Sequence, residues 1–322
     1  MKTLIRCLKL AAAACAIGAS LPGTALATDL TLFKTVFNTD FAAAGFGGMR
    51  GLGTGSITLA AGVGAGTVSE AYLFWHGPSN ASTASAATAN ATVKFNGTDV
   101  TGTFLGISSD NCWGFANSLA YRANVTGLVT GDATYALSNF IKPGGIDVNG
   151  TSLVVFYNDG NAANNRDVVM FNGNDSNISN PLDADGWNIT LAGINYSSGT
   201  ASAQFHVSDG QTFTDDAVIA NSTTLAPVGS VFDGNTVPNG PGGPSNGGLW
   251  DIKDFNITSL LSPGPNSLHI TTGVNGDCLS CVLIAIDLPA GAAPPDVPEP
   301  ASLGLVGVAL AGLAVARRRR KV

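Results

Sequence analysis

Glutamate, the commonest polar residue of helix surfaces, is almost absent from this chain. Only two glutamates occur in 322 residues, Glu70 and Glu299, and Asn, Thr, Ser, Gly and Asp supply most of the polarity. These residues favour turns and the exposed faces of strands, and most of them are poor helix formers. Short apolar runs, such as the aromatic-rich residues 70–75 and the valine-containing residues 152–157, fit the same interpretation. The composition therefore predicts an all-β fold.

The first 27 residues have the pattern of an export signal. Three basic residues within the first nine precede an apolar run at residues 10–21, and Ala-Leu-Ala at residues 25–27 offers small side chains for cleavage. We therefore predict a signal peptide over residues 1–27, which signal peptidase removes.

The other end of the chain has three parts in a fixed order. Pro298-Glu299-Pro300 precedes an uncharged apolar run at residues 301–316, and a basic cluster follows at residues 317–321. As a helix the run would be about 24 Å long, close to the roughly 30 Å core of a bilayer. The basic cluster predicts a cytoplasmic C-terminus, which puts the rest of the chain outside. Its residues are Arg317, Arg318, Arg319, Arg320 and Lys321.

This tail resembles the PEP-CTERM sorting signal of Gram-negative bacteria, over residues 298–322. The resemblance implies that an exosortase-type membrane protease recognises the tail. The protein would then cross the inner membrane transiently and reach the cell surface or the medium, in association with an extracellular polysaccharide or biofilm matrix. Removal of the tail and its retention as a single-span anchor are both open. The Pro/Ala segment 290–297 is predicted to be a stiff linker.

Between its two ends the chain is acidic. Of the 15 basic residues, three lie in the signal peptide and five in the tail, and of the 22 acidic residues one lies in the tail. The part between therefore has 7 basic and 21 acidic residues, a net charge of −14. Nucleic-acid binding needs a basic surface, so we expect no nucleic-acid partner.

One pattern occurs twice along this acidic body. Asn124-Val-Thr and Asn256-Ile-Thr each precede a strand, a loop and a long apolar strand. The Asn and Thr side chains can cap a single helical turn at such a place. We interpret the pattern as an internal duplication, with β-sandwich halves at residues 28–170 and 171–289.

The repeated unit also resembles part of the galactose-binding-like jelly rolls, best over residues 256–270. In that family an Asp-Val-Thr-type turn, a leucine pair and a Pro-Gly-x-Asn turn lead into a strand; here Asn replaces the usual Asp. The resemblance implies two packed jelly rolls or one larger sandwich. Elsewhere, residues 30–36 are predicted to form an edge strand, and the Gly/Pro/Asn-rich residues 234–248 a loop without regular structure.

Three cysteines remain after export, Cys112, Cys278 and Cys281. An oxidising compartment favours disulfide bonds. A bridge between Cys278 and Cys281 is one candidate, and pairing of either with Cys112 is the other. A redox-active CxxC motif opens a helix, whereas residues 282–286 continue as an apolar strand, so we predict a structural bridge.

Oxygen ligands for calcium are concentrated between residues 158 and 186. Carboxylate and amide oxygens are the ligands that calcium prefers, and the residue order at 183–186 matches half of a calcium loop. Asn, Asp and Gly are also the ordinary turn residues of β proteins, so both interpretations are open. The candidate ligands are Asp159, Asp167, Asp175, Asp183 and Asp185.

The tryptophans suggest a second kind of binding site. Trp113, Trp187 and Trp250 lie at loops or strand ends, where an indole ring can stack on a sugar ring, whereas Trp75 lies inside an apolar strand and is expected in the core.

No catalytic signature is found. The histidines His76, His206 and His269 lie in separate segments, no HExxH or GxSxG motif occurs, and no spacing indicates the paired carboxylates of a glycosidase. We therefore expect an exported, non-enzymatic cell-surface or extracellular-matrix protein. The alternatives are a calcium- or carbohydrate-binding module of that matrix, and a hydrolase acting on its polysaccharide.

Overall fold

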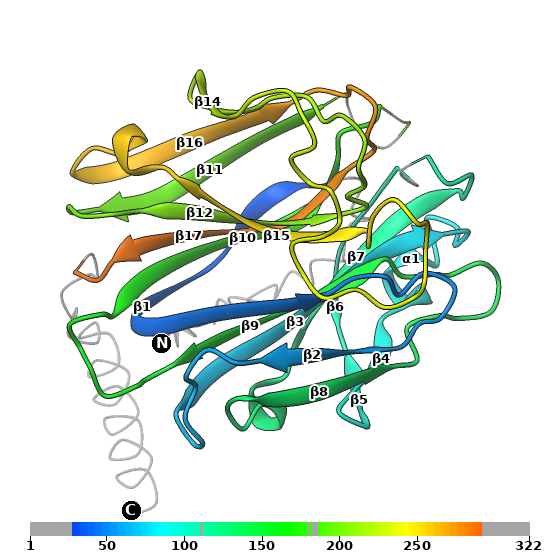
Figure 1. Cartoon of the computed structure of the whole chain (residues 1–322), viewed down its shortest axis with the longest axis horizontal. Coiled ribbons are helices and arrows are strands. Elements are labelled where there is room, and N and C mark those ends of the chain that lie inside the picture. Colours follow the sequence, from blue (N-terminus) through cyan, green and yellow to red (C-terminus); the bar gives the residue numbers. More distant parts are fainter. Residues whose placement is uncertain (1–27, 110–111, 180, 182–185, 292–322) are drawn as a thin grey trace, which may run out of the picture.

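The computed structural model describes residues 28–109, 112–179, 181 and 186–291, and these residues are mostly β-strand (Figure 1). The prediction of an all-β fold is therefore confirmed. The predicted signal peptide and sorting tail lie outside the described residues. The first nine strands are β1 (Thr28–Phe46), β2 (Gly55–Leu59), β3 (Val68–Ser79), β4 (Thr92–Phe95), β5 (Thr98–Thr101), β6 (Thr103–Ser108), β7 (Asn117–Asn124), β8 (Ala133–Ser138) and β9 (Gly150–Tyr157). The next eight are β10 (Arg166–Ser176), β11 (Trp187–Tyr196), β12 (Ser202–Ser208), β13 (Val218–Ala220), β14 (Thr223–Ala226), β15 (Trp250–Asn256), β16 (Gly264–Thr272) and β17 (Ser280–Pro289). The helical elements are α1 (Ala86–Ala89) and the 3-10 turns η1 (Thr126–Leu128) and η2 (Thr258–Leu260).

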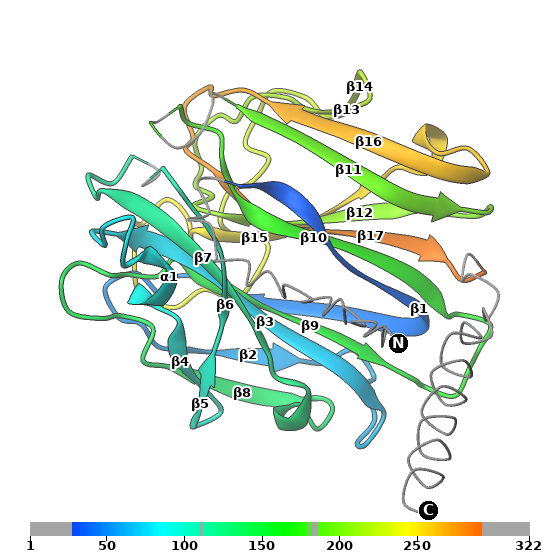
Figure 2. The same cartoon turned by 180° about the vertical axis from the view of Figure 1, so that it is seen from behind.

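The strands form four stacked layers (Figures 1 and 2). A nine-stranded sheet with the order β15-β12-β17-β10-β1-β9-β3-β7-β6 folds over at β1, so that its two arms face each other. The sheet β2-β8-β4-β5 covers the outer face of one arm, and the sheet β11-β16-β13-β14 covers the outer face of the other. Three clusters of buried apolar side chains fill the spaces between the four layers. This arrangement is consistent with a β-sandwich.

Strand β1 connects the two arms. Residues 28–39 pair with β10, and residues 40–46 pair with β9. The change of partner occurs next to Asn38, whose φ of +53° is a left-handed conformation that Asn adopts more readily than most residues. Residues 30–36 pair with β10 alone, so the prediction that they form an edge strand is confirmed. Each arm ends in an apolar strand, β9 or β10, and β1 hydrogen-bonds to both.

The two halves contain the same series of elements. In the first half β3 lies between β9 and β7, and in the second half β12 lies between β17 and β15. The strands of the two outer sheets correspond in the same order, β2-β8-β4-β5 in the first half and β11-β16-β13-β14 in the second. Strand β6 has no counterpart, and a long loop over residues 227–249 stands in its place. The expected boundary between residues 170 and 171 falls inside β10, because the second series begins with that strand.

The repeated Asn-x-Thr segments make the same contacts in both halves. Asn124 and Asn256 each accept a hydrogen bond from the N–H of the threonine two residues later, at 3.0 and 2.9 Å. In turn, Oγ1 of each threonine accepts a hydrogen bond of 2.9 Å from the backbone N–H of an alanine, which lies within β3 in the first half and directly before β12 in the second. The pairs are Thr126 with Ala71 and Thr258 with Ala201. These contacts tie η1 and η2 to the middle strand of each arm.

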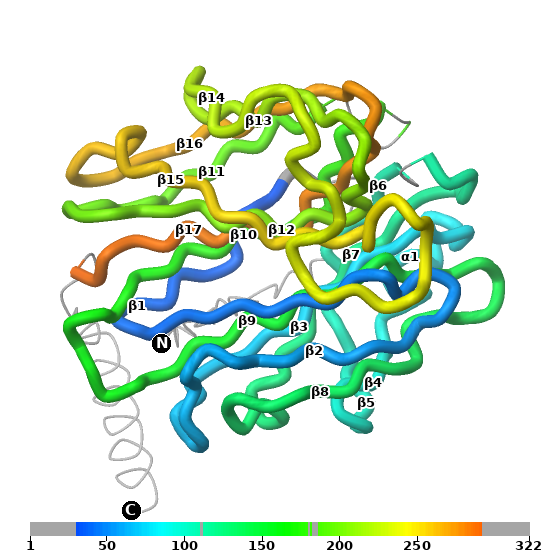
Figure 3. Tube along the Cα trace, viewed as in Figure 1, coloured from blue at the N-terminus to red at the C-terminus, as the bar shows by residue number. Residues whose placement is uncertain are grey.

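The loop at residues 227–249 packs against the end of β1 (Figure 3). Gly47 donates a hydrogen bond to the carbonyl of Pro238, and Gly240 donates one back to the carbonyl of Gly47, both at 3.0 Å. The backbones approach closely here, since a Cβ atom on Gly47 would lie 2.4 Å from the carbonyl oxygen of Gly248. The loop lacks strands beyond β14, as expected, and its glycines allow this contact.

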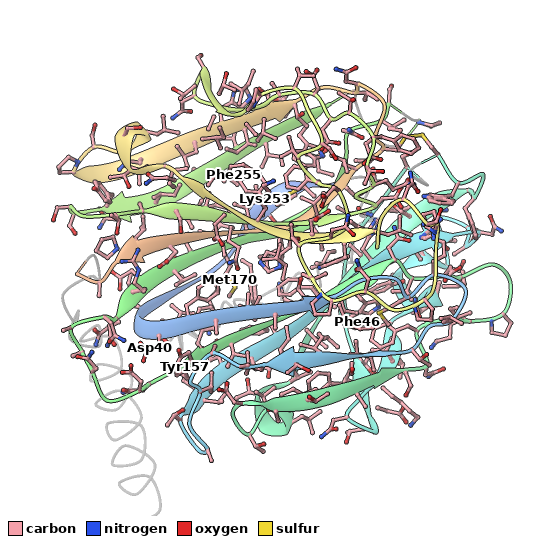
Figure 4. The ribbon with its side chains drawn as sticks, viewed as in Figure 1. Asp40, Phe46, Tyr157, Met170, Lys253 and Phe255 are labelled. Carbon is pink, nitrogen blue, oxygen red and sulfur yellow. A yellow bond between two sulfur atoms is a disulfide. The ribbon has the colours of Figure 1, made fainter. Side chains whose placement is uncertain are left out.

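The space between the two arms is apolar at its centre and polar at one end. Met170 lies between the arms (Figure 4) and is fully buried. Nearby, Ser152 Oγ accepts a hydrogen bond of 2.8 Å from Trp250 Nε1 and lies 2.7 Å from His206 Nδ1. Burial lowers the pKa of His206 to about 3, so the ring is neutral at physiological pH. His206 is a satisfied interior residue.

Candidate functional site

Of the five acidic residues predicted to bind calcium, the three that the structure describes do not come together. Asp167 and Asp175 lie near opposite ends of β10, roughly 26 Å apart along an extended strand. Asp159 lies in the loop before that strand. Within the part of the chain that the structure describes, no three His, Cys, Asp or Glu side chains are grouped to hold a metal ion. Asp183 and Asp185 lie outside that part.

The reason is that these carboxylates stabilise turns. Asp159 accepts a hydrogen bond of 2.7 Å from the N–H of Asn161, within its own turn. Asp167 is buried and accepts hydrogen bonds from the N–H groups of Asn38 and Gly291, at 2.8 and 3.0 Å. Asn and Asp commonly cap turns in this way. The turn interpretation therefore accounts for both side chains.

The disulfide bond joins Cys112 to Cys278, so the second of the two candidate pairings is correct and a bridge between Cys278 and Cys281 is not formed. The Cα atoms of Cys112 and Cys278 are 6.3 Å apart. In an extended chain, residues three apart are separated by about 10 Å, beyond the roughly 7 Å limit for a disulfide. Cys281 is a buried free thiol in the core of the second half. The bridge therefore connects a loop of the first half to a loop of the second.

Three of the four tryptophans are core residues. The exposed fractions of Trp75, Trp187 and Trp250 are 0, 2 and 0%. Of the candidates for sugar stacking, Trp187 and Trp250 are therefore core residues instead. Trp187 begins a strand but faces inward, where its ring packs 5.8 Å from that of Phe232. Only Trp113, which is half-buried, remains available for a ligand.

A hollow of about 330 Å³ opens beside Trp113. Both halves of the molecule line it, through the loop after β6, the segment after β12 and the loop before β17. The exposed fraction of Phe213 on its wall is 48%, so two aromatic rings border the hollow. The lining residues are Cys112, Trp113, Gln211, Phe213, Gly276, Asp277 and Cys278.

The indole of Trp113 is held from two sides. Its Nε1–H group donates to both carboxylate oxygens of Asp209, at 2.8 Å each. The guanidinium of Arg50 lies over the ring, 3.8 Å from its centroid, and forms an ion pair of 3.3 Å with Asp209. A cation over an indole face is attractive. Trp113 is therefore a fixed aromatic surface rather than a mobile side chain.

A buried polar network supports this arrangement. Asn149 Nδ2 donates to Asp209 Oδ1 at 2.9 Å and to Ser208 Oγ at 3.0 Å, and Asn149 Oδ1 accepts hydrogen bonds from Arg50. Ser208 Oγ lies 2.7 Å from His76 Nδ1. Burial raises the pKa of Asp209, and Arg50 and Trp113 act in the opposite direction. The network joins the two halves directly behind the hollow.

Three further buried carboxylates, here called the loop carboxylates, hold the loops of the second half. Asp277 accepts hydrogen bonds from the backbone N–H groups of Gln211 and Cys278, at 2.8 and 2.9 Å. Asp215 and Asp251 accept hydrogen bonds of 2.7–2.8 Å from backbone N–H groups of the long loop at residues 227–249. Burial raises the pKa of Asp277 to about 7 and that of the other two to about 6. The loop carboxylates are Asp215, Asp251 and Asp277.

A second hollow, of about 500 Å³, lies at the ends of β12, β15 and β17. Arg166 donates from Nε to Asp287 at 2.6 Å and from Nη2 to the carbonyl of Thr200 at 2.9 Å. The aromatic ring nearest to this hollow, Phe255, is only 8% exposed. This hollow therefore lacks an aromatic surface for a ligand.

Comparison with known protein families covers most of the chain. Residues 61–286 match the family described as "Protein of unknown function (DUF3344)". The chain belongs to the DUF3344 family. The match begins after β2 and ends within β17 of this DUF3344 protein, and it includes Trp113 and every residue that lines the hollow. No curated protein matches the chain.

The tail of this DUF3344 protein is identified as well. Residues 296–320 match the PEP-CTERM protein-sorting motif, which confirms the predicted sorting signal. The protein is therefore exported through an exosortase-type system, to the cell surface or the extracellular space. Among the described residues, no helix is long and apolar enough to span a bilayer. The apolar run at residues 301–316 lies outside them.

Sequence reasoning found Trp113 but missed its neighbours. Arg50, Asp209 and Asp277 come from three separate loops, and nothing in their local sequence distinguishes them from turn residues. One signal was present: Arg50 is one of only seven basic residues between the signal peptide and the tail, and it lies in a glycine-rich, otherwise apolar segment. A cation in such surroundings usually has a buried partner.

Proposed function

We propose that this protein is a non-enzymatic carbohydrate-binding module of the cell surface or extracellular matrix, and that the hollow beside Trp113 is its binding site. The main support for this proposal is that the indole ring of Trp113 is held in one position at the surface. Trp113 is kept at the surface by Asp209 and Arg50, while the other tryptophans are buried. Aromatic rings of this kind stack on the apolar faces of sugar rings, and polar groups nearby fix the orientation.

The polar groups in the hollow suit hydroxyl recognition. Gln211 and Asp277 line the hollow beside the two aromatic rings. Asp277 is held by two backbone N–H groups, and Gln211 Nε2 donates to Asn246 at 2.8 Å, so both side chains are preorganised. The side chain of Asp277 is only 1% exposed, so it acts on a ligand through its charge and through the backbone that it holds. Preorganised polar groups reduce the entropic cost of binding.

Export by an exosortase-type system is consistent with a ligand in an extracellular polysaccharide. We propose binding rather than hydrolysis because Asp277 is the one acidic residue among the described residues that line this hollow, and its side chain is only 1% exposed. Canonical glycoside hydrolysis uses two carboxyl groups about 5–10 Å apart across the bond.

A glycan array probed with the exported protein tests the proposal. A matched pair of variants provides the control: Phe213→Ala removes a side chain on the hollow, and Leu52→Ala removes an equally exposed side chain elsewhere, both 48% exposed. We expect Phe213→Ala to weaken binding and Leu52→Ala to leave it unchanged. Release of reducing sugar from the bound glycan would instead support the hydrolase. Absence of binding to any glycan would refute the proposal.

A further inference from the structure

The hollow beside Trp113 has an uneven charge distribution. Among the described residues that line it there is no Lys, Arg or His, and the one acidic residue is Asp277, whose side chain is buried at 1% exposure. The nearest cation that contacts a lining residue is Arg50, which lies over Trp113 and is paired with Asp209. This positive charge is therefore already balanced.

More negative charge lies behind the wall. The carboxylates of Asp209, Asp215 and Asp251 are all buried and close enough to Asp277 for electrostatic repulsion to contribute to the raised pKa values of Asp209 and Asp277. Lys253 is the cation that faces Asp215. Charges in such a low-dielectric region act more strongly than in water. An anionic ligand in the hollow would meet Asp277 with no free cation to offset it.

From these observations we infer that the hollow selects neutral hexopyranose units over acidic sugars, with Asp277 as the specificity-determining residue. This inference rests on the proposed carbohydrate-binding function. The aromatic rings of Trp113 and Phe213 contact the C–H face of a sugar, and the buried carboxylate of Asp277 sets the charge beneath it. A uronic acid unit places a carboxylate where the neutral sugar has a CH₂OH group, and repulsion by Asp277 then weakens binding.

The test uses matched pairs of glycans: each acidic oligosaccharide on the array together with its carboxyl-reduced derivative, which differs only in CH₂OH in place of the carboxylate. Measurements are made at pH 8, above the pKa of about 7 of Asp277. We expect the neutral member of a bound pair to bind about tenfold more tightly than the acidic member. The difference shrinks as salt is added, because exposed charges are screened.

Two variants make the outcome specific. Asp277→Asn removes the charge and should reduce the preference for the neutral glycan about fivefold or more, whereas Asp99→Asn, an exposed carboxylate paired with Lys94 on another sheet, should not change it. If Asp277→Asn does not fold, the salt dependence of the wild type tests the inference instead. A preference for the neutral glycan that does not shrink as salt is added would then overturn it. Equal binding of acidic and neutral members overturns this inference but leaves the proposed function intact. No binding to any glycan overturns both.

Discussion

The threonine caps of the two halves allow a quantitative test of the duplicated architecture. Thr258 Oγ1 accepts the N–H of Ala201 at 2.9 Å, and Ala201 is 2% exposed. Thr258→Val keeps the shape of the side chain but removes the acceptor, so a buried N–H group loses its partner. Such a loss costs about 1–3 kcal/mol. We therefore expect the free energy of unfolding to fall by about 2 kcal/mol, and the melting temperature to fall by roughly 4–8 °C.

The assay is urea unfolding followed by circular dichroism, together with thermal unfolding. The urea midpoint should decrease with an unchanged m-value, because the surface exposed on unfolding is the same. Thr258→Ser is the control, since it keeps the acceptor and should cost less than about 1 kcal/mol.

The first half supplies an independent copy of this experiment. Thr126 Oγ1 accepts the N–H of Ala71 at the same 2.9 Å. Thr126→Val should therefore cost the same as Thr258→Val to within about 0.5 kcal/mol, and the two costs should add in the double variant, because distant sites are independent. A cost below about 0.5 kcal/mol for either Val variant would refute the reasoning.

The remaining predictions concern buried polar groups. The pKa of Asp277 is raised to about 7 in the folded protein, so its stabilising contribution is present at low pH and is lost as pH rises through 7. Asp277→Asn should consequently cost about 1 kcal/mol more at pH 6.5 than at pH 8, as measured by urea unfolding, and a pH-independent cost would contradict this. Ser152→Ala removes the shared partner of Trp250 and His206 and should cost about 2–4 kcal/mol by the same assay, whereas a cost below 1 kcal/mol would show that the two rings do not need it. The thiol of Cys281 is buried, and burial raises its pKa, so it should react with a thiol reagent only after unfolding; rapid reaction in the folded protein would disprove its burial.

The sequence predicted what depends on composition and on local order. Scarce glutamate and abundant Asn, Thr and Ser indicated strands, and the order of the tail indicated the sorting signal, because both properties are local. The Asn124 and Asn256 segments were equally informative, since a capped turn is set by a few adjacent residues.

Contacts between distant segments were not predictable in this way. The partners of β1 depend on two strand edges that are more than a hundred residues away in sequence, and the sequence of residues 30–36 does not specify them. The same applies to the bridge between Cys112 and Cys278, which are separated by 166 residues. Trp187 and Trp250 begin their strands, but the covering layer, rather than their position in the strand, determines that they are buried.

The candidate site depends on such long-range contacts. Trp113 remains at the surface because Arg50 and Asp209, which come from different halves of the molecule, hold its ring. Their side chains meet only after the arms of the nine-stranded sheet have folded over each other. A turn residue and a site residue therefore look alike until the layers are known.

The central claim is that Trp113 is the ligand-binding surface of this exported protein. Titration calorimetry with a neutral oligosaccharide identified on the glycan array tests it most directly, by comparing the wild type with Trp113→Ala at equal folded fraction. Truncation of an aromatic anchor typically costs about 2 kcal/mol or more, so the account predicts at least a roughly thirtyfold weaker affinity for the variant. An unchanged affinity in a folded Trp113→Ala protein would contradict the account.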